Sequence, residues 1–81
     1  MGLSRRTALD RLEGLARQVE IHLDKLEGDR DALGRQHWRA ELSGWLPEMR
    51  ALLRHVGRRT ADQWTPRIAA WESRLADQDD E

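Results

Sequence analysis

The chain has 81 residues, of which 38% are hydrophobic and 36% are charged, with a net charge of −1 and no cysteine. This length supports one small domain, and the charge excludes a globally basic nucleic-acid binder without excluding a local basic patch. The absence of cysteine excludes disulfides, thiolate metal ligands and a thiol nucleophile, and is compatible with a reducing cytoplasm. No apolar run reaches the roughly 18 residues of a membrane span, and the N-terminal segment lacks the apolar core of a secretory signal. We therefore expect a cytoplasmic protein without a membrane partner.

Residues ~5–27 have the periodicity of an amphipathic helix. Apolar residues recur at steps of three and four, as a helix buried along one face requires: Leu9, Leu12, Ala16, Val19, Leu23 and Leu26. Ser4 or Thr7 is a suitable N-cap, because a hydroxyl oxygen accepts a hydrogen bond from a first-turn amide. Gly28 follows the last apolar position, where glycine commonly ends a helix.

Residues ~36–56 carry the strongest pattern and predict the central helix. Its apolar positions also follow steps of four and three: Trp38, Leu42, Trp45, Met49, Leu52 and Val56. Pro47 interrupts this helix but falls opposite the apolar face, so we expect one helix with a kink near Pro47. The alternative is a second helix that begins at Pro47. Residues 28–36 form the preceding connection, in which Asp29 or Asp31 caps an early turn.

Residues ~61–77 predict a third helix. Its apolar positions are Ala61, Trp64, Ile68, Trp71 and Leu75. Thr60 and Gln63 resemble a capping box, in which each side chain accepts a hydrogen bond from a backbone amide. Pro66 either kinks this helix or begins it, with Thr65 as its cap. The acidic segment 77–81 is expected to fray.

Three amphipathic helices joined by short connections predict an all-α, up-down-up antiparallel three-helix bundle that forms a single domain over residues 1–81. Antiparallel pairing places Trp45 opposite Trp71 and small Ala16 beside Met49 and Ile68. All four tryptophans are therefore expected in the core.

Part of this pattern resembles a bacterial family described as domain of unknown function 29. Residues His22, Leu23 and Lys25 are similar to a His-Leu-x-Lys motif that ends a helix in that family. After a polar loop, the Trp-Arg pair and the following heptad positions also match in register: Trp38, Arg39, Leu42, Met49, Leu52 and Leu53. The resemblance covers residues ~4–53 and implies an α-helical fold and no known activity.

We expect no catalytic residue, no metal site and no cofactor. His22 and His55 fall near opposite ends of the predicted bundle, and no pair of histidines has the i, i+4 spacing of a helical zinc site. Aspartate and glutamate residues lie among basic residues on faces that should be solvated. The chain contains no glycine-rich loop and no nucleophile elbow. We therefore expect a protein that is not an enzyme.

Two features suggest binding surfaces. Basic residues gather at the end shared by the N-terminus and the second connection, and they define a basic tip: Arg5, Arg6, Arg54, Arg58 and Arg59. Apolar residues also lie outside the main pattern, namely Leu15, Ile21, Leu46 and Leu53. They either widen the core or line a surface for a partner protein or a second copy.

We expect the protein to be a small protein-protein interaction or regulatory module. It would bind a partner protein, or a second copy of itself, through the apolar residues outside the main pattern. The alternative is a nucleic-acid-binding accessory protein that uses the basic tip, in which case its affinity would fall steeply with salt.

Overall fold

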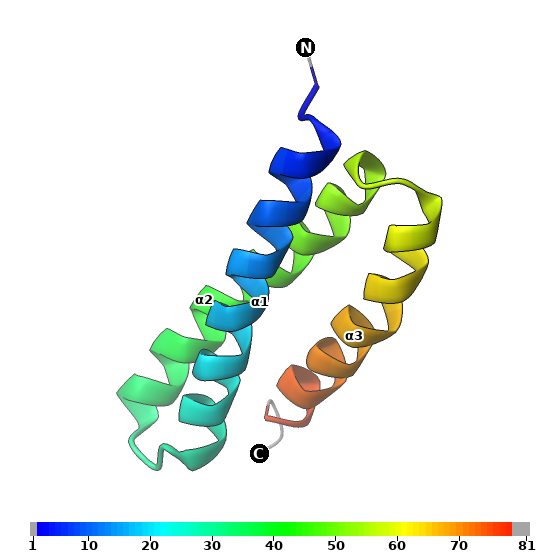
Figure 1. Ribbon diagram of the computed structural model, residues 1–81. Coiled ribbons are helices and arrows are strands. Elements are labelled where there is room, and N and C mark those ends of the chain that lie inside the picture. Colours follow the sequence, from blue (N-terminus) through cyan, green and yellow to red (C-terminus); the bar gives the residue numbers. More distant parts are fainter. Residues whose placement is uncertain (1, 79–81) are drawn as a thin grey trace.

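The computed structural model describes residues 2–78 and consists of three helices, each antiparallel to the one before it (Figure 1). Helix α1 spans Arg5–Gly28 and α2 spans Ala32–Leu52, followed by a short 3-10 helix, η1, at Leu53–His55. Helix α3 spans Arg58–Asp77. The N-terminus and the η1–α3 connection therefore lie at one end, with the α1–α2 connection and the end of α3 at the other (Figure 1). The predicted all-α three-helix bundle is confirmed.

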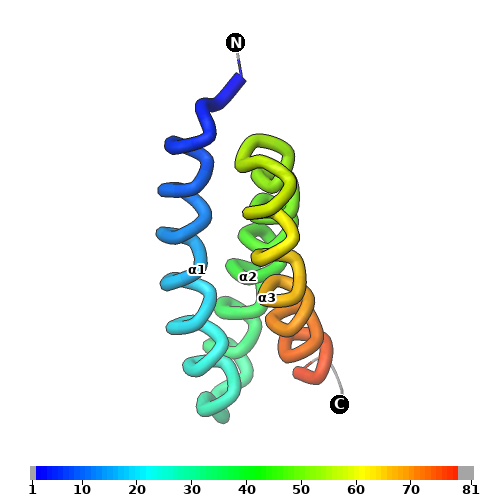
Figure 2. Tube along the Cα trace, turned by 45° about the vertical axis from the view of Figure 1, so that its right-hand side comes forward, coloured from blue at the N-terminus to red at the C-terminus, as the bar shows by residue number. Residues whose placement is uncertain are grey.

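The bundle is elongated, with principal dimensions of 41 × 20 × 16 Å. Its three helices follow the long direction in both views (Figures 1 and 2). No helix within residues 2–78 has the length and apolar character needed to cross a bilayer. Each narrow end gathers side chains from segments that are far apart in the sequence.

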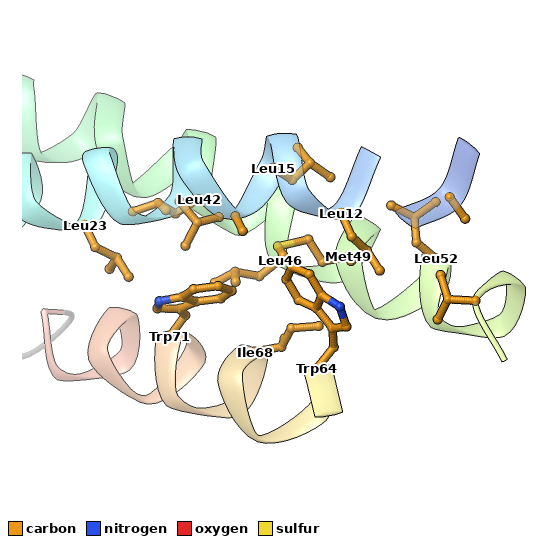
Figure 3. Packing of buried hydrophobic residues seen from close by; sticks show 14 of the residues in the cluster. Leu12, Leu15, Leu23, Leu42, Leu46, Met49, Leu52, Trp64, Ile68 and Trp71 are labelled. Carbon is orange, nitrogen blue, oxygen red and sulfur yellow. The ribbon is translucent and has the colours of Figure 1, made fainter. Parts of the chain in front are cut away.

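The core is formed by aliphatic residues of α1 and α2 that pack over two tryptophans of α3 (Figure 3). Leu12 and Leu23 of α1 and Met49 of α2 are completely buried, as is Ile68 of α3. None of the polar or charged residues in the described part of the chain is buried. The predicted helical periodicity thus corresponds to a continuous apolar interior.

The orientation of α2 differs from the prediction. Leu46 is only 2% exposed and lies with Leu42 and Met49 on the face that packs over Trp64 and Trp71 (Figure 3). The expectation that all four tryptophans lie in the core is wrong, because only Trp64 and Trp71 are buried. Trp45 and Trp38 are only partly buried and pack against the core from its edge. A compact leucine fills the space above the two indoles of α3, and the larger tryptophans turn toward the outer flank of α1.

The flank between α1 and α2 is an aromatic cluster. The ring of His22 makes edge contacts with Trp45, at a centroid distance of 4.7 Å, and with Trp38, at 5.1 Å. The Nδ1–H of His22 donates to the carbonyl oxygen of Gln18 at 2.8 Å, because a carbonyl can only accept. Lys25 adds a cation 4.8 Å from the centre of the Trp38 ring. These contacts explain how two large indoles remain stable at the edge of the core.

Two of the predicted caps are present. Ser4 accepts a hydrogen bond from the Thr7 amide at 3.0 Å, and Asp31 accepts one from the Gly34 amide, also at 3.0 Å. Both side chains satisfy first-turn amides that have no partner within their helix. Helix α2 consequently begins four residues earlier than predicted, at Ala32.

The predicted start of the third helix at Ala61 is wrong. Helix α3 begins at Arg58, and its N-cap is Gly57, with φ of 86° and no side-chain cap. The capping box of Thr60 and Gln63 is therefore absent, because both residues are already inside the helix. Only Val56 and Gly57 separate η1 from α3, so the chain reverses within two residues.

Both interior prolines lie within continuous α-helices. The alternative in which a new helix begins at Pro47 or Pro66 is therefore wrong. Helix α2 passes through Pro47 but ends at Leu52, and the residues after it tighten into η1. Near Pro66, the hydroxyl of Thr65 donates to the carbonyl oxygen of Ala61 at 2.8 Å. A proline has no amide to donate, so each leaves a carbonyl in the preceding turn without its helical hydrogen bond.

The end opposite the basic tip is held together by Arg35. Its Nη1 donates to the carbonyl oxygen of Leu26 at 2.9 Å, and its Nη2 donates to that of Gln78 at 3.3 Å. This arginine of α2 therefore satisfies carbonyls at the C-terminal ends of both α1 and α3. The predicted frayed tail is corrected in part, since Asp77 belongs to α3 and Gln78 caps it. Residues 79–81 lie outside the described part of the chain.

Candidate functional site: the basic tip

The basic tip is assembled from three short segments at one end of the bundle. Arg5 and Arg6 lie in the first turn of α1, Arg54 lies in η1, and Arg58 and Arg59 lie in the first turn of α3. All five side chains are exposed. All five arginines of the predicted basic tip thus lie at the same end of the bundle. Arg58 and Arg59 belong to α3 and not to the connection in which they were predicted.

The arginines of the tip have no acidic partner within residues 2–78. Elsewhere, ion pairs between helices neutralise arginines along the sides of the bundle. Arg50 forms a two-pronged pair with Glu72 at 2.7 Å, and Arg74 pairs with Glu27 at 2.7 Å. The tip therefore concentrates cationic charge at one end of the bundle, although Asp62 lies beside Arg58 and Arg59 without forming an ion pair with them.

The ion pairs along the sides shift the ionisation of their carboxylates. Hydrogen bonds from Arg50 hold the pKa of Glu72 below its ordinary value, and those from Arg74 do the same for the pKa of Glu27. The arginine partners respond in the opposite sense, with the pKa of each guanidinium raised by its hydrogen bond to the carboxylate. These charges therefore serve to join α3 to its two neighbours.

Two hollows open at the basic tip. The first has a volume of about 330 Å³ and contains no acidic residue in its lining: Arg5, Val56, Gly57, Arg58, Arg59 and Thr60. The second, of about 480 Å³, is lined by Arg58, Arg59, Asp62 and Gln63. The two share Arg58 and Arg59, so these side chains can face a ligand in either hollow.

Gly57 shapes the first hollow. A methyl group added at its Cα would lie 3.2 Å from the Arg5 guanidinium, so Arg5 rests against the backbone where α3 begins. Its φ of 86° and ψ of 153° belong to a region that is almost restricted to glycine. Because α3 has no side-chain cap, its first amides keep their hydrogen-bonding capacity beside these arginines. A Gly followed by two arginines is the sequence signal for this arrangement, and the capping-box interpretation missed it.

Three of the four residues of the predicted apolar partner surface lie in the core or against it. Leu15 and Leu46 are buried, and Leu53 is half-buried against the core. Only Ile21 is exposed, with 48% of its surface accessible. The alternative, that these residues widen the core, agrees with the burial of Leu15 and Leu46. The reason is the rotation of α2, which takes Leu46 inward.

No cluster of three or more potential metal-ligating side chains occurs within residues 2–78. His22 and His37 both pack against Trp38, while His55 lies in η1 beside the basic tip. The fold and this site together define a small all-α bundle with one cationic end. Comparison with known proteins finds no matching family model, no similar curated protein and no similar solved structure.

Proposed function

We propose that this chain is a small interaction module that binds an acidic segment of another protein at its basic tip and has no catalytic activity of its own. The observation that carries the proposal is the gathering of five exposed arginines at one end of the bundle, none of which pairs with an acidic residue within residues 2–78, whereas Arg50 and Arg74 on its sides pair with glutamates. This replaces the apolar flank as the expected contact surface, because Leu15 and Leu46 are buried.

The chemistry of arginine supports an anionic partner. A guanidinium group presents donors in a planar fork that matches a carboxylate or a phosphate, and it is more weakly hydrated than an ammonium group. Four of the five arginines occupy the first turns of α1 and α3, so a folded scaffold positions them before a ligand arrives. A pre-positioned group loses less conformational freedom on binding.

The proposal places the protein in a bacterial cytoplasm and requires no cofactor or metal. The lack of cysteine is compatible with that location. Membership of the domain of unknown function 29 family is a separate hypothesis, supported by the register of Trp38, Arg39 and Leu42 in the sequence. Within this proposal, self-association would use the large apolar side chains that are exposed on the described structure, namely Leu3, Ile21 and Leu33.

The competing function is nucleic-acid binding through the same arginines. It is less favoured, because the cationic surface is confined to one narrow end and the chain as a whole carries a net charge of −1. Phosphate contacts along a strand would require a longer basic track.

A binding titration separates these two functions. A fluorescent hexaglutamate peptide and a fluorescent single-stranded DNA of equal charge are titrated with the protein at about 50 and 200 mM salt. We expect the peptide to bind, and the double charge reversal Arg58→Glu with Arg59→Glu to weaken its binding about tenfold or more. The matched control is Arg17→Glu with Arg30→Glu, two exposed arginines away from the tip.

Equal peptide binding by the tip variant and the control variant would reject the basic tip as the site. Preferential binding of the DNA that disappears at the higher salt concentration would establish the competing function.

A further inference from the structure

The first hollow of the basic tip has three arginines and no acidic residue in its lining, whereas the second hollow includes Asp62. Arg5 comes from α1, whereas Arg58 and Arg59 come from α3. The buried side chain of Val56, which is 1% exposed, forms part of its lining. The hollow is therefore a shallow, open depression with cations from two helices around it.

Three guanidinium groups around one concavity exceed what a single carboxylate can engage. A carboxylate carries one negative charge on two oxygens. A phosphate monoester carries about −1.5 to −2 charges and three strongly accepting oxygens. Arginine forks bind such groups through pairs of parallel hydrogen bonds, which are about twice as strong as neutral ones. Three arginines thus match the three oxygens of a phosphate monoester, whose charge offsets more of their positive charge than the single charge of a carboxylate would.

The geometry points to a phosphorylated side chain of a partner protein as the ligand of this hollow: we propose that Arg5, Arg58 and Arg59 together bind a phosphoserine or phosphothreonine. The proposal rests on the proposed function and specifies which acidic segment the basic tip prefers. The amides in the uncapped first turn of α3 lie at the same place and add donors to those of the arginines.

The second hollow favours a phosphoprotein over a nucleic acid. It adjoins the first through Arg58 and Arg59, and its lining includes the carboxylate of Asp62. A nucleic-acid strand places a further phosphate on each side of any one that it docks, and one of these would approach Asp62. A phosphorylated side chain carries a single phosphate group, and the peptide backbone on either side of it is uncharged. A phosphopeptide therefore brings no second phosphate near Asp62 unless a neighbouring side chain is also phosphorylated. The side-chain oxygens of Asp62 and Gln63, which line this second hollow, are able to accept hydrogen bonds from the amides of a peptide.

The test compares three fluorescent peptides that share one neutral sequence. The first carries a central phosphoserine, the second carries serine, and the third carries two adjacent glutamates that match the charge of the phosphate. We expect the phosphopeptide to bind at least about tenfold more tightly than the glutamate peptide, and the serine peptide to show no binding. A phosphate-terminated lipid in neutral vesicles and a single-stranded DNA serve as competitors, and neither should displace the phosphopeptide efficiently.

The site is tested with variants of single arginines. Arg5→Ala, Arg58→Ala and Arg59→Ala should each weaken phosphopeptide binding about tenfold, and the matched control Arg30→Ala should leave it unchanged. Arg58→Lys keeps the charge but loses the planar fork, so it should bind at an intermediate level. A circular dichroism spectrum shows whether each variant is folded, and the lysine variant provides the same comparison if an alanine variant is not.

Equal affinity for the phosphopeptide and the glutamate peptide would overturn the preference for phosphate and leave the proposed function intact. Absence of binding to both peptides, together with no response to hexaglutamate, would overturn both. Stronger binding of the vesicles or of the DNA than of the phosphopeptide would overturn the assignment to a phosphoprotein.

Discussion

Gly57 is the residue on which the geometry of the basic tip depends most directly. Its φ of 86° and ψ of 153° allow the chain to pass from η1 into α3 within two residues and bring Arg58 and Arg59 beside Arg5. A side chain at this position is strained in that conformation at a cost of about 1–3 kcal/mol. The nearest atoms to an added methyl group belong to the flexible end of Arg5, so the backbone angle is the main penalty.

We predict that Gly57→Ala lowers the free energy of unfolding by about 1–3 kcal/mol, measured by urea denaturation followed by circular dichroism. The control is Gly44→Ala, in the interior of α2, where an added methyl group meets no atom within 4 Å. That change should raise the free energy of unfolding by about 0.5–1 kcal/mol, because alanine favours a helix over glycine. Equal effects of the two substitutions would contradict the role assigned to the conformation of Gly57.

At the scale of the elements, α2 shows how tertiary packing overrides local preference. Pro47 lies inside this helix and is exposed, so it contributes nothing to the core and removes one backbone hydrogen bond. Proline in a helix interior costs about 3 kcal/mol relative to alanine. The helix persists because Leu42, Leu46 and Met49 are buried on its other side.

We predict that Pro47→Ala raises the free energy of unfolding by about 1–2 kcal/mol. The relief of the helix penalty is partly offset by about 1 kcal/mol, because proline also restricts the unfolded chain. Chemical denaturation monitored at 222 nm measures the change. Pro66→Ala, at an exposed interior position of α3, should act in the same direction. A decrease for both variants would mean that the bundle requires the backbone shape that the prolines impose.

At the scale of the whole molecule, ion pairs connect α3 to both of its neighbours. Arg50 of α2 pairs with Glu72 of α3, and Arg74 of α3 pairs with Glu27 of α1. These carboxylates are about one-third exposed, so each pair is worth at most about 0.5–1 kcal/mol. The pairs lie along the sides of the bundle, and the five arginines of the tip form no ion pair within residues 2–78.

We predict that acid weakens the fold through these pairs. The pKa values of Glu27 and Glu72 in the folded protein lie below the ordinary value of 4.5. The stabilising contribution is therefore complete above about pH 4.5 and is lost as the pH falls through the lower folded-state pKa. Glu72→Gln should cost about 0.5–1 kcal/mol at pH 7, and its difference from the wild type should shrink toward pH 2. Thermal unfolding across this pH range measures both effects.

The matched control is Glu13→Gln, an exposed glutamate of α1 that forms no ion pair within the described residues. It should change the free energy of unfolding by less than about 0.5 kcal/mol at either extreme of pH. A constant difference between Glu72→Gln and the wild type at all pH values would rule out the linkage.

The amino-acid sequence by itself determined the number of helices, their direction and the end at which the arginines gather. Those properties follow from apolar periodicity and from short connections, which are local features of the chain. The caps at Ser4 and Asp31 were among the predicted alternatives for the same reason, because a cap is formed within one turn.

Only the tertiary structure decided which face of α2 points inward and what shape the basic tip takes. Trp45 and Leu46 are adjacent apolar residues, and the sequence pattern accommodates either of them in the core. The indoles of Trp64 and Trp71 decided the choice, because the space above them fits a leucine, and Trp45 instead packs against His22. The hollow beside Gly57 likewise needs Arg5 and Arg58 together, two residues that are far apart in the chain and meet only when the helices pack.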